Sequence, residues 1–307
     1  MSLRPALTDL LELRHQAHTV GIASHHPVNS ALCGLYASVF RGQGMDFEEV
    51  REYQEGDEIR NMDWRVTART GVPHLKVFRE ERERSVILCV DIGERMAFGT
   101  RNTFKSVQAA RVAALLGWSA NSNQDRVGAL LYGDPVMGLQ SFRPTRARRS
   151  LWQMLRVLTE PVHPGRHHTD PLQDALELLN RSVATGALVF LIGDMNRDPV
   201  EFERHIGRLR QRREVVLIPV DDPADRDIPP MGRVLFGGTD GRRLEIDTDN
   251  ASGRALYRER WEKTRAQLMT IAARLGVAVI PIATNDNVRD ALQGGLRLRA
   301  QRMVGQR

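Results

Sequence analysis

Residues 86–91 read VILCVD, a run of five apolar residues closed by an aspartate. A continuous apolar run, unlike an alternating one, is typical of a strand that is buried on both faces. Four similar runs follow along the chain, namely VGALLY at 127–132, ALVFLI at 187–192, VVLIPV at 215–220 and VAVIPI at 277–282. Together they predict five parallel strands at the centre of one sheet.

Helical patterns separate these runs. One predicted helix, which has an apolar face, begins after a possible cap at Asn102 or Thr103. A second predicted helix ends at Gly276, just before the last apolar run. Strands that alternate with helices indicate right-handed crossovers, so we expect an α/β fold with a doubly wound, mostly parallel sheet. Residues 222–249 break the alternation with clusters of Pro and Gly, which predicts an inserted hairpin or loop.

The first 84 residues differ from the rest. They begin with a short amphipathic pattern around Leu7, Leu10 and Leu11 and continue with short pieces punctuated by Gly and Asp. We therefore predict two domains, with an N-terminal helix plus a small irregular or β-rich unit at 1–84 and the main α/β domain at 85–307.

Composition sets the broad class. The chain has 307 residues, of which 41% are hydrophobic and 27% charged, and these are the proportions of a globular protein. No apolar run approaches the roughly 20 residues of a membrane span, and the N-terminus lacks an export-signal pattern. Cys33 and Cys89 do not suggest a disulfide framework. We expect a cytoplasmic protein that is not inserted in a membrane.

The formal net charge of +6 raises the question of nucleic-acid binding. The arginine clusters fall in helical patterns and have few aromatic residues among them, so we interpret them as solvated helix faces and regard nucleic acid as an unlikely partner. These clusters are Arg146, Arg148 and Arg149, and Arg208, Arg210, Arg212 and Arg213.

Acidic residues follow four of the predicted strands: Asp91, Asp134, Asp194 and Asp221. In open α/β sheets, ligands bind beyond the carboxyl ends of the strands. Any one of these acids could instead be a turn former or a helix cap. Asp91 and Asp194 together are the strongest candidates for a shared site.

Two resemblances sharpen this prediction. The string DIGERM at 91–96 resembles the metal-site motif of von Willebrand factor A domains, written DxSxS, while HHTD at 167–170 and the pair Gly193 and Asp194 resemble the second and third loops of that site. Residues 44–69 carry GMDF, REYQEGDEIRNMDW and TAR and resemble the bacterial family called domain of unknown function 58. The main domain is therefore expected to have the von Willebrand factor A type of sheet.

The resemblance implies an Mg²⁺ site with Asp91, Thr169 and Asp194 as ligands, because Mg²⁺ prefers oxygen donors. Gly93 and Arg95 occupy the two serine positions of the motif, so two hydroxyl ligands are missing. We hypothesise that Arg95 replaces the metal and offers its guanidinium to a carboxylate of a partner. The predicted partner-binding residues are Asp91, Gly93, Arg95, Thr169 and Asp194. No cofactor is expected, and Mg²⁺ is the alternative.

We interpret one further group of residues as a structural network and consider a second group as a zinc site. We expect a buried network under Trp64 that joins the two parts of the chain, made of Asp57, Arg60, Asp63, Trp64 and Arg69. A zinc site at His163, His167 and His168 is an alternative that lacks a cysteine or a helical HxxxH pair.

The chain has no Walker-type phosphate loop and no GxSxG elbow, so the sequence offers no support for an enzyme. The family resemblance implies a non-catalytic adaptor that works with a MoxR-type AAA+ ATPase and its client in protein assembly or maturation. The alternatives are a divalent-metal hydrolase with Asp91, Asp170 and Asp194 as ligands, and a nucleic-acid-binding protein.

Overall fold

The computed structural model describes residues 3–17, 45–54, 62–80, 85–163, 165, 170–196, 199–237 and 243–304. The chain divides into two compact units. The main unit contains Met1–Ser38 and Arg84–Arg307, and the small unit contains Val39–Glu83. Each unit is described by itself.

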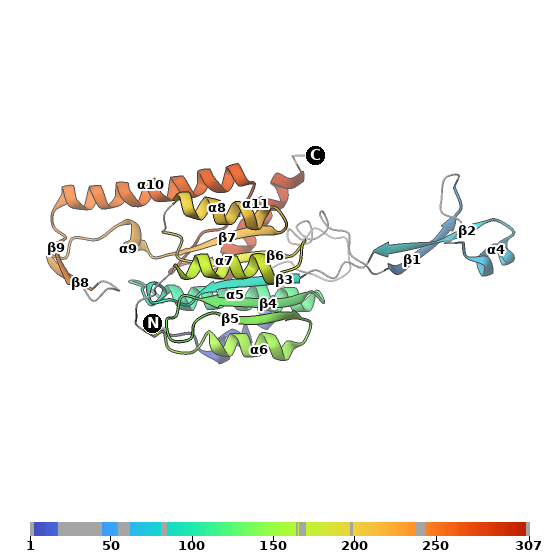
Figure 1. Cartoon of the computed structure of the whole chain (residues 1–307), viewed down its shortest axis with the longest axis horizontal. Coiled ribbons are helices and arrows are strands. Elements are labelled where there is room, and N and C mark those ends of the chain that lie inside the picture. The colour runs from blue at the N-terminus through green and yellow to red at the C-terminus, as the bar shows by residue number, and fades with distance from the viewer. Residues whose placement is uncertain are drawn as a thin grey trace. The chain divides into compact units, whose positions relative to one another are not determined.

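The main unit is built on a seven-stranded sheet with the order β10-β7-β6-β3-β4-β5, in which β11 also pairs with β7 (Figure 1). All pairs are parallel except β4 with β5. The predicted α/β class with a mostly parallel sheet is confirmed. The strands are β3 (Ser85–Asp91), β4 (Arg126–Tyr132), β5 (Gln140–Thr145), β6 (Leu188–Gly193), β7 (Glu214–Asp221), β10 (Ala278–Val279) and β11 (Ile282–Ala283).

Two strands differ from the prediction. The run at 277–282 forms two short strands because Pro281 has no N–H to donate to a sheet, while the N–H of Ile280 bonds to the carbonyl of Leu217 at 2.8 Å. The antiparallel edge strand β5 was not predicted. Its sequence, QSFRPT, is mostly polar and contains Pro144, and within sheets proline is largely confined to edge strands.

Helices cover both faces of the sheet, and side chains of β3 alternate between the two cores. Val86, Leu88 and Val90 pack with α5 (Lys105–Ser122), α6 (Arg148–Val157) and α11 (Val288–Val304). Ile87 and Cys89 pack with α7 (Pro171–Ser182), α8 (Pro199–Arg210) and α10 (Ala251–Leu275). The alternation explains why the run at 86–90 has no polar member, since neither face of β3 meets water.

The central helix α5 is buried on nearly all sides. It begins one residue after Phe104, which makes no side-chain cap, so the predicted cap at Asn102 or Thr103 is wrong. The predicted end of α10 is confirmed, because Gly276 has the left-handed conformation with φ 62°.

The leading helices α1 (Leu7–Glu12) and α2 (Arg14–Ala17) belong to the main unit, which corrects the prediction that they group with the residues up to 84. Leu10 is 1% exposed in the core beside α5. The indole N–H of Trp118 donates to the carbonyl of Leu10 at 3.0 Å. The apolar stripe of α1 is buried against the larger unit, which offers it an existing core.

In the small unit, β1 (Met45–Glu52) pairs antiparallel with β2 (His74–Glu80), and α4 (Trp64–Thr70) lies between them in sequence. Asp63 caps α4 by accepting from the N–H groups of Arg65 and Val66. Trp64 is 67% exposed and Arg69 is exposed in this unit, and the network that is expected to join the two parts of the chain stays a prediction. Asp57 and Arg60 lie outside the described residues.

The segment predicted as an insertion contains α9 (Pro223–Arg226) and an antiparallel hairpin of β8 (Arg233–Gly237) and β9 (Arg243–Asp247). In Figure 1 the hairpin lies beside the start of α10. None of the described helices combines the length and the apolar composition that a membrane span requires.

The anchoring of α1 can be tested by Leu10→Ala. Removing a side chain that is 1% exposed leaves a cavity between α1 and α5, so we expect the free energy of unfolding to fall by about 2–4 kcal/mol in urea denaturation. Leu3→Ala is the matched control, because Leu3 is 51% exposed and its loss should cost less than about 0.5 kcal/mol. Equal effects of the two changes would contradict the docking of α1.

Candidate functional site

Acidic residues gather where the parallel strands end. Asp91 closes β3, Asp194 follows β6, and Asp221 and Asp222 lie at the end of β7. Because β3, β6 and β7 are parallel neighbours, their carboxyl ends meet at one edge of the sheet. The predicted gathering of acids at this edge, here called the crest, is what the strand order produces.

Asp91 lies in a tight backbone pocket and is 4% exposed. Its Oδ1 accepts a hydrogen bond from the N–H of Gly93 at 2.9 Å. A Cβ added at Gly133 would lie 2.6 Å from Asp91 Oδ1, and one added at Gly193 would lie 2.4 Å from Asp91 Cβ. Two glycines at the ends of the neighbouring strands therefore make room for this carboxylate.

Gly93 occupies the first serine position of the resembling motif, and the structure shows why a serine does not fit. A Cβ at residue 93 would lie 2.7 Å from the carbonyl oxygen of Gly133. Real Cβ atoms do not approach a backbone oxygen so closely, so a side chain here requires the end of β4 to move. The close packing around Asp91 therefore leaves no room for a serine hydroxyl at position 93.

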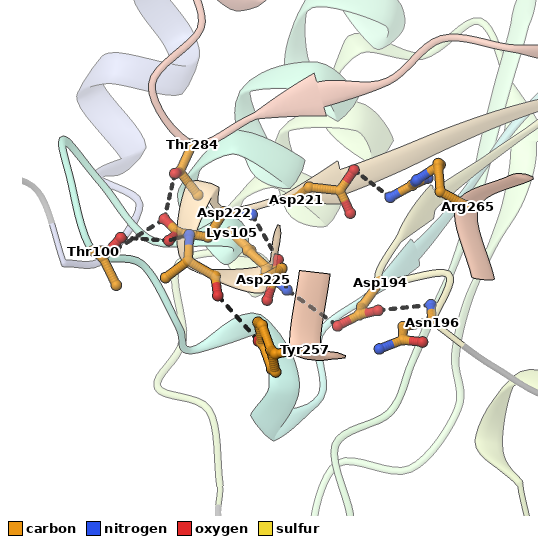
Figure 2. Close-up of polar contacts among 11 residues, drawn as sticks. Thr100, Lys105, Asp194, Asn196, Asp221, Asp222, Asp225, Tyr257, Arg265 and Thr284 are labelled. Atoms are coloured by element: carbon orange, nitrogen blue, oxygen red, sulfur yellow. Dashed lines mark hydrogen bonds and ion pairs between the residues drawn. The ribbon is translucent and has the colours of Figure 1, made fainter. Parts of the chain in front are cut away.

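The cation of the crest is Lys105, the first residue of α5 (Figure 2). Its side chain is 3% exposed, and its Nζ lies 2.7 Å from Asp225 Oδ2 and 3.2 Å from Asp194 Oδ2. Burial alone would lower the pKa of the Lys105 ammonium, but the charges of Asp194 and Asp225 outweigh burial and raise this pKa above its ordinary value. Lys105 is therefore a fixed positive charge.

Asp222 ties the loop before α5 to the end of β7. It accepts hydrogen bonds from the hydroxyls of Thr100 and Thr284, both at 2.5 Å, and from the N–H of Thr100 at 2.9 Å. It also caps α9 reciprocally with Asp225. Burial raises the pKa of Asp222, yet these hydrogen bonds to the charged form outweigh it and hold the pKa below its ordinary value.

The other side of the crest holds a second ion pair, between Asp221 and Arg265. The guanidinium of Arg265 lies 5.2 Å from the ring centre of Trp261. Burial raises the pKa of Asp221 above its ordinary value, against the pull of Arg265. Burial likewise raises the pKa of Asp225, against the pull of Lys105. Figure 2 shows the ion pair between Asp221 and Arg265 together with the contact between Lys105 and Asp194.

Arg95 does not replace the metal beside the aspartates, as the sequence hypothesis proposed. Its side chain is exposed, whereas the ammonium that neutralises Asp194 comes from Lys105. Sequence reasoning missed Lys105, although a signal was present. A lysine at the first position of a helix opposes the helix dipole, so this lysine needed carboxylate partners.

Two of the other candidate ligands, Asp170 and His163, are described by the structure and have partners of their own. Asp170 caps α7 by accepting from the N–H of Leu172 at 3.0 Å, and His163 bonds to Asp134 through its backbone N–H and its Nδ1. Thr169, His167 and His168 lie outside the described residues. Within the described ranges, no three His, Cys, Asp or Glu side chains are placed to hold a metal ion.

Asp134, at the end of β4, is 1% exposed. Burial raises its pKa, but donors from Met137, His163 and Val136 outweigh burial and lower it below the ordinary value. Cys89, buried behind Asp91, has a thiol pKa raised first by burial and second by the charge of Asp91, so it is an inert thiol.

Residues 49–267 match the model of a family described as "Protein of unknown function DUF58". The chain belongs to this family. Uncharacterized proteins of Mycobacterium bovis and Mycobacterium tuberculosis are each 31% identical over 233 residues, which is 75% of this chain and 72% of theirs. Recognition from the motifs at 44–69 is confirmed.

Solved structures give weaker likenesses. An aerotolerance-related membrane protein of Bacteroides fragilis is 18% identical with a TM-score of 0.46, covering 72% of this chain and 100% of that one. A von Willebrand factor type A protein of Catenulispora acidiphila is 13% identical with a TM-score of 0.39, covering 72% and 43%.

The residues at the crest do not fit the divalent metal that the von Willebrand resemblance implies. Position 93 has neither a hydroxyl nor space for one. Asp194 already accepts from Lys105 through Oδ2 and from the N–H of Asn196 through Oδ1 at 2.8 Å. A metal here would have to share its ligand with a buried ammonium, which repulsion between cations opposes.

Lys105→Met tests the internal cation. Removing one partner of a buried ion pair leaves carboxylates uncompensated, so we expect the free energy of unfolding at pH 7 to fall by about 3–5 kcal/mol. The pKa of Lys105 is raised by folding. Its stabilisation is therefore complete below the unfolded pKa of about 10.4 and is lost as pH rises through the folded pKa.

Denaturation of wild type and variant across alkaline pH measures this difference. Lys263→Met is the matched control, because Lys263 is exposed on α10 and its loss should change stability by less than about 0.5 kcal/mol. A Lys105→Met protein as stable as the control variant would refute the role of Lys105.

Asp222→Asn tests the tie between the loop before α5 and β7. We expect a loss of about 1–3 kcal/mol at pH 7, since hydrogen bonds to a charged acceptor are replaced by weaker ones. Folding depresses the pKa of Asp222. The difference from wild type should thus be complete above about pH 3.9 and shrink as pH falls through the folded pKa. Asp9→Asn, at an exposed position of α1, is the matched control and should change stability at pH 7 by less than about 0.5 kcal/mol in the same urea titrations.

Proposed function

We propose that the main unit is a protein-interaction module whose binding surface is the loop at residues 94–102, and that it works without a divalent metal and without catalysing a reaction. One observation carries this proposal: the buried ammonium of Lys105 stands between Asp194 and Asp225. Lys105 thereby neutralises part of the charge of the crest from within the chain, and in this proposal the loop needs no bound ion to be held in one conformation.

Some side chains of the loop hold it to the main unit, while others are exposed to solvent. Met96 is fully buried, and Thr100 is bonded to Asp222 through its N–H and its hydroxyl. The ring of Phe98 lies 5.6 Å from the Nζ of Lys105, yet Phe98 is 38% exposed. A preorganised loop loses little conformational entropy when it binds a partner.

The exposed side chains of the loop define the chemistry of the partner. Arg95 and Arg101 are both exposed and flank the exposed Phe98 in the sequence. A loop that offers two guanidinium groups and an aromatic ring suits a partner surface with carboxylates and an apolar side chain. In this proposal Arg95 binds a carboxylate of the partner, as the sequence suggested, while Lys105 takes the structural role.

Family resemblance supports the choice of partner. We propose a MoxR-type AAA+ ATPase and its client in protein assembly or maturation, with the complex in the cytoplasm. Among the described residues no observation favours the metal-dependent hydrolase, because Asp170 caps a helix and Asp194 is paired with Lys105.

A pull-down with the full chain and the purified MoxR-type ATPase of the same organism tests the proposal. Charge reversal by Arg95→Glu with Arg101→Glu should weaken binding by at least about tenfold, the loss expected when central charged contacts become repulsive. The chelator EDTA should leave binding unchanged, provided that Mg²⁺ for the nucleotide is left out of both samples.

Arg204→Glu with Arg208→Glu is the matched control, because it makes the same change of charge at exposed positions of α8. Equal losses in the two double variants, or binding that EDTA abolishes, would refute the metal-free loop surface. Failure of the wild-type chain to capture the ATPase with or without ATP would refute this partner.

A further inference from the structure

The outer face of α6 combines arginines with a tryptophan. Arg148, Arg149, Trp152 and Arg156 recur at spacings of three and four residues, so they share one side of the helix. All three arginines are exposed, and Trp152 is 40% exposed. The opposite side, which carries Leu151, Met154 and Leu155, is buried in the core. The cationic face is thus held on a helix that the core fixes in place.

The charge around this face is unusually one-sided. Residues 135–159 contain five arginines and no aspartate or glutamate. The three arginines of α6 pair with no carboxylate within the ranges that the structure describes. By contrast, Arg226, Arg258 and Arg274 elsewhere in this unit each have an acidic partner. Three guanidinium groups on this face are therefore available to a ligand.

We propose that this face, defined as Arg148, Arg149, Trp152 and Arg156, binds an acidic segment of a partner protein. The inference deepens the proposed function and rests on it, since it gives the interaction module a second docking surface. Every cation of the face is an arginine, whose planar fork binds a carboxylate through two hydrogen bonds. Opposite charges on the two proteins provide the attraction and the orientation.

Trp152 favours a protein ligand. Tryptophan and arginine are the residue types most enriched at the centres of protein interfaces. Nucleic-acid surfaces that bind single strands use several aromatic rings in a row for stacking, whereas Trp152 is the one aromatic residue of α6. A membrane-surface helix inserts its apolar face into lipid, but the apolar face of α6 is occupied by the core.

The partner docks through side chains and not by adding a strand. The neighbouring strand β5 is the edge of the sheet, which in principle is open to an added strand. Its Pro144 has no N–H to donate, and the pairing of β4 with β5 shifts register between Val127 and Ala129. Both features interrupt the regular ladder that strand addition requires.

The test uses the full chain and a fluorescently labelled short peptide of glutamates with a central leucine, followed by anisotropy. The variant Arg148→Gln, Arg149→Gln, Arg156→Gln should bind the peptide at least about tenfold more weakly than wild type. The control Arg204→Gln, Arg208→Gln, Arg210→Gln removes the same charge from exposed positions of α8 and should change binding less than about threefold. Equal losses would overturn the proposal, because they would show attraction by net charge alone.

Trp152→Ala keeps every charge and should weaken binding of the peptide by about threefold or more. Trp64→Ala, at an exposed tryptophan of the small unit, should leave binding of the peptide unchanged. An oligothymidylate of the same net charge and vesicles of anionic lipid are the competing ligands. Tighter binding of either to wild type than of the peptide would overturn the proposal. Thermal melts of each variant show whether it is folded.

The variant Arg95→Glu with Arg101→Glu separates this inference from the proposed function. It should still bind the peptide within about threefold of wild type, because the loop at 94–102 is a different surface. Loss of the peptide in this variant, with binding kept in the α6 variant, would overturn the α6 site. Failure of the ATPase pull-down with normal peptide binding would count against the partner and not against the site.

Discussion

The crest depends on one buried lysine, Lys105, whose ammonium group partly neutralises the negative charge of the nearby carboxylates. A parallel sheet brings the ends of β3, β6 and β7 to one edge, and each of these strands is followed by an acid. Carboxylates buried so close together would repel one another. Lys105, placed by the first turn of α5, lies between Asp194 and Asp225 and removes much of that cost.

The same lysine couples parts of the main unit that are distant in sequence. Asp194 belongs to the end of β6, and Asp225 to the short helix after β7, which is also bonded to the loop before α5 through Asp222 and Thr100. The crest is therefore a closed set of contacts, and the loop at 94–102 inherits its rigidity. A rigid, exposed loop is the physical basis for assigning a binding role to this edge of the sheet.

The strands were predictable because their burial on both faces leaves a direct mark on the sequence, as in the run at 86–90. The gathering of Asp91 and Asp194 followed from the parallel order. The identity of the cation did not follow, since Lys105 is far from Asp194 in sequence and only the packing of α5 unites them. Arg95 was favoured because it stood inside the motif, yet its side chain points to solvent.

Other misses have equally local causes. The edge strand β5 carries too little apolar sequence to be recognised, and α1 gave no sign of which unit it would cover. The arginines of α6 were interpreted as an ordinary solvated face, because Trp152 could be placed among them only once the helix was known. The burial of Arg213, which donates to the carbonyl of Val183, removes it from the other predicted cluster.

The close approach of Gly93 to the backbone of Gly133 has a consequence for any attempt to engineer this edge. A single codon change to serine cannot recreate an ion-binding hydroxyl, since the new atom arrives where the carbonyl of the adjacent strand already stands. Compensating shifts in β4 would have to come first, and the lysine would have to leave. Building a metal site at this edge therefore requires several coupled changes in the chain.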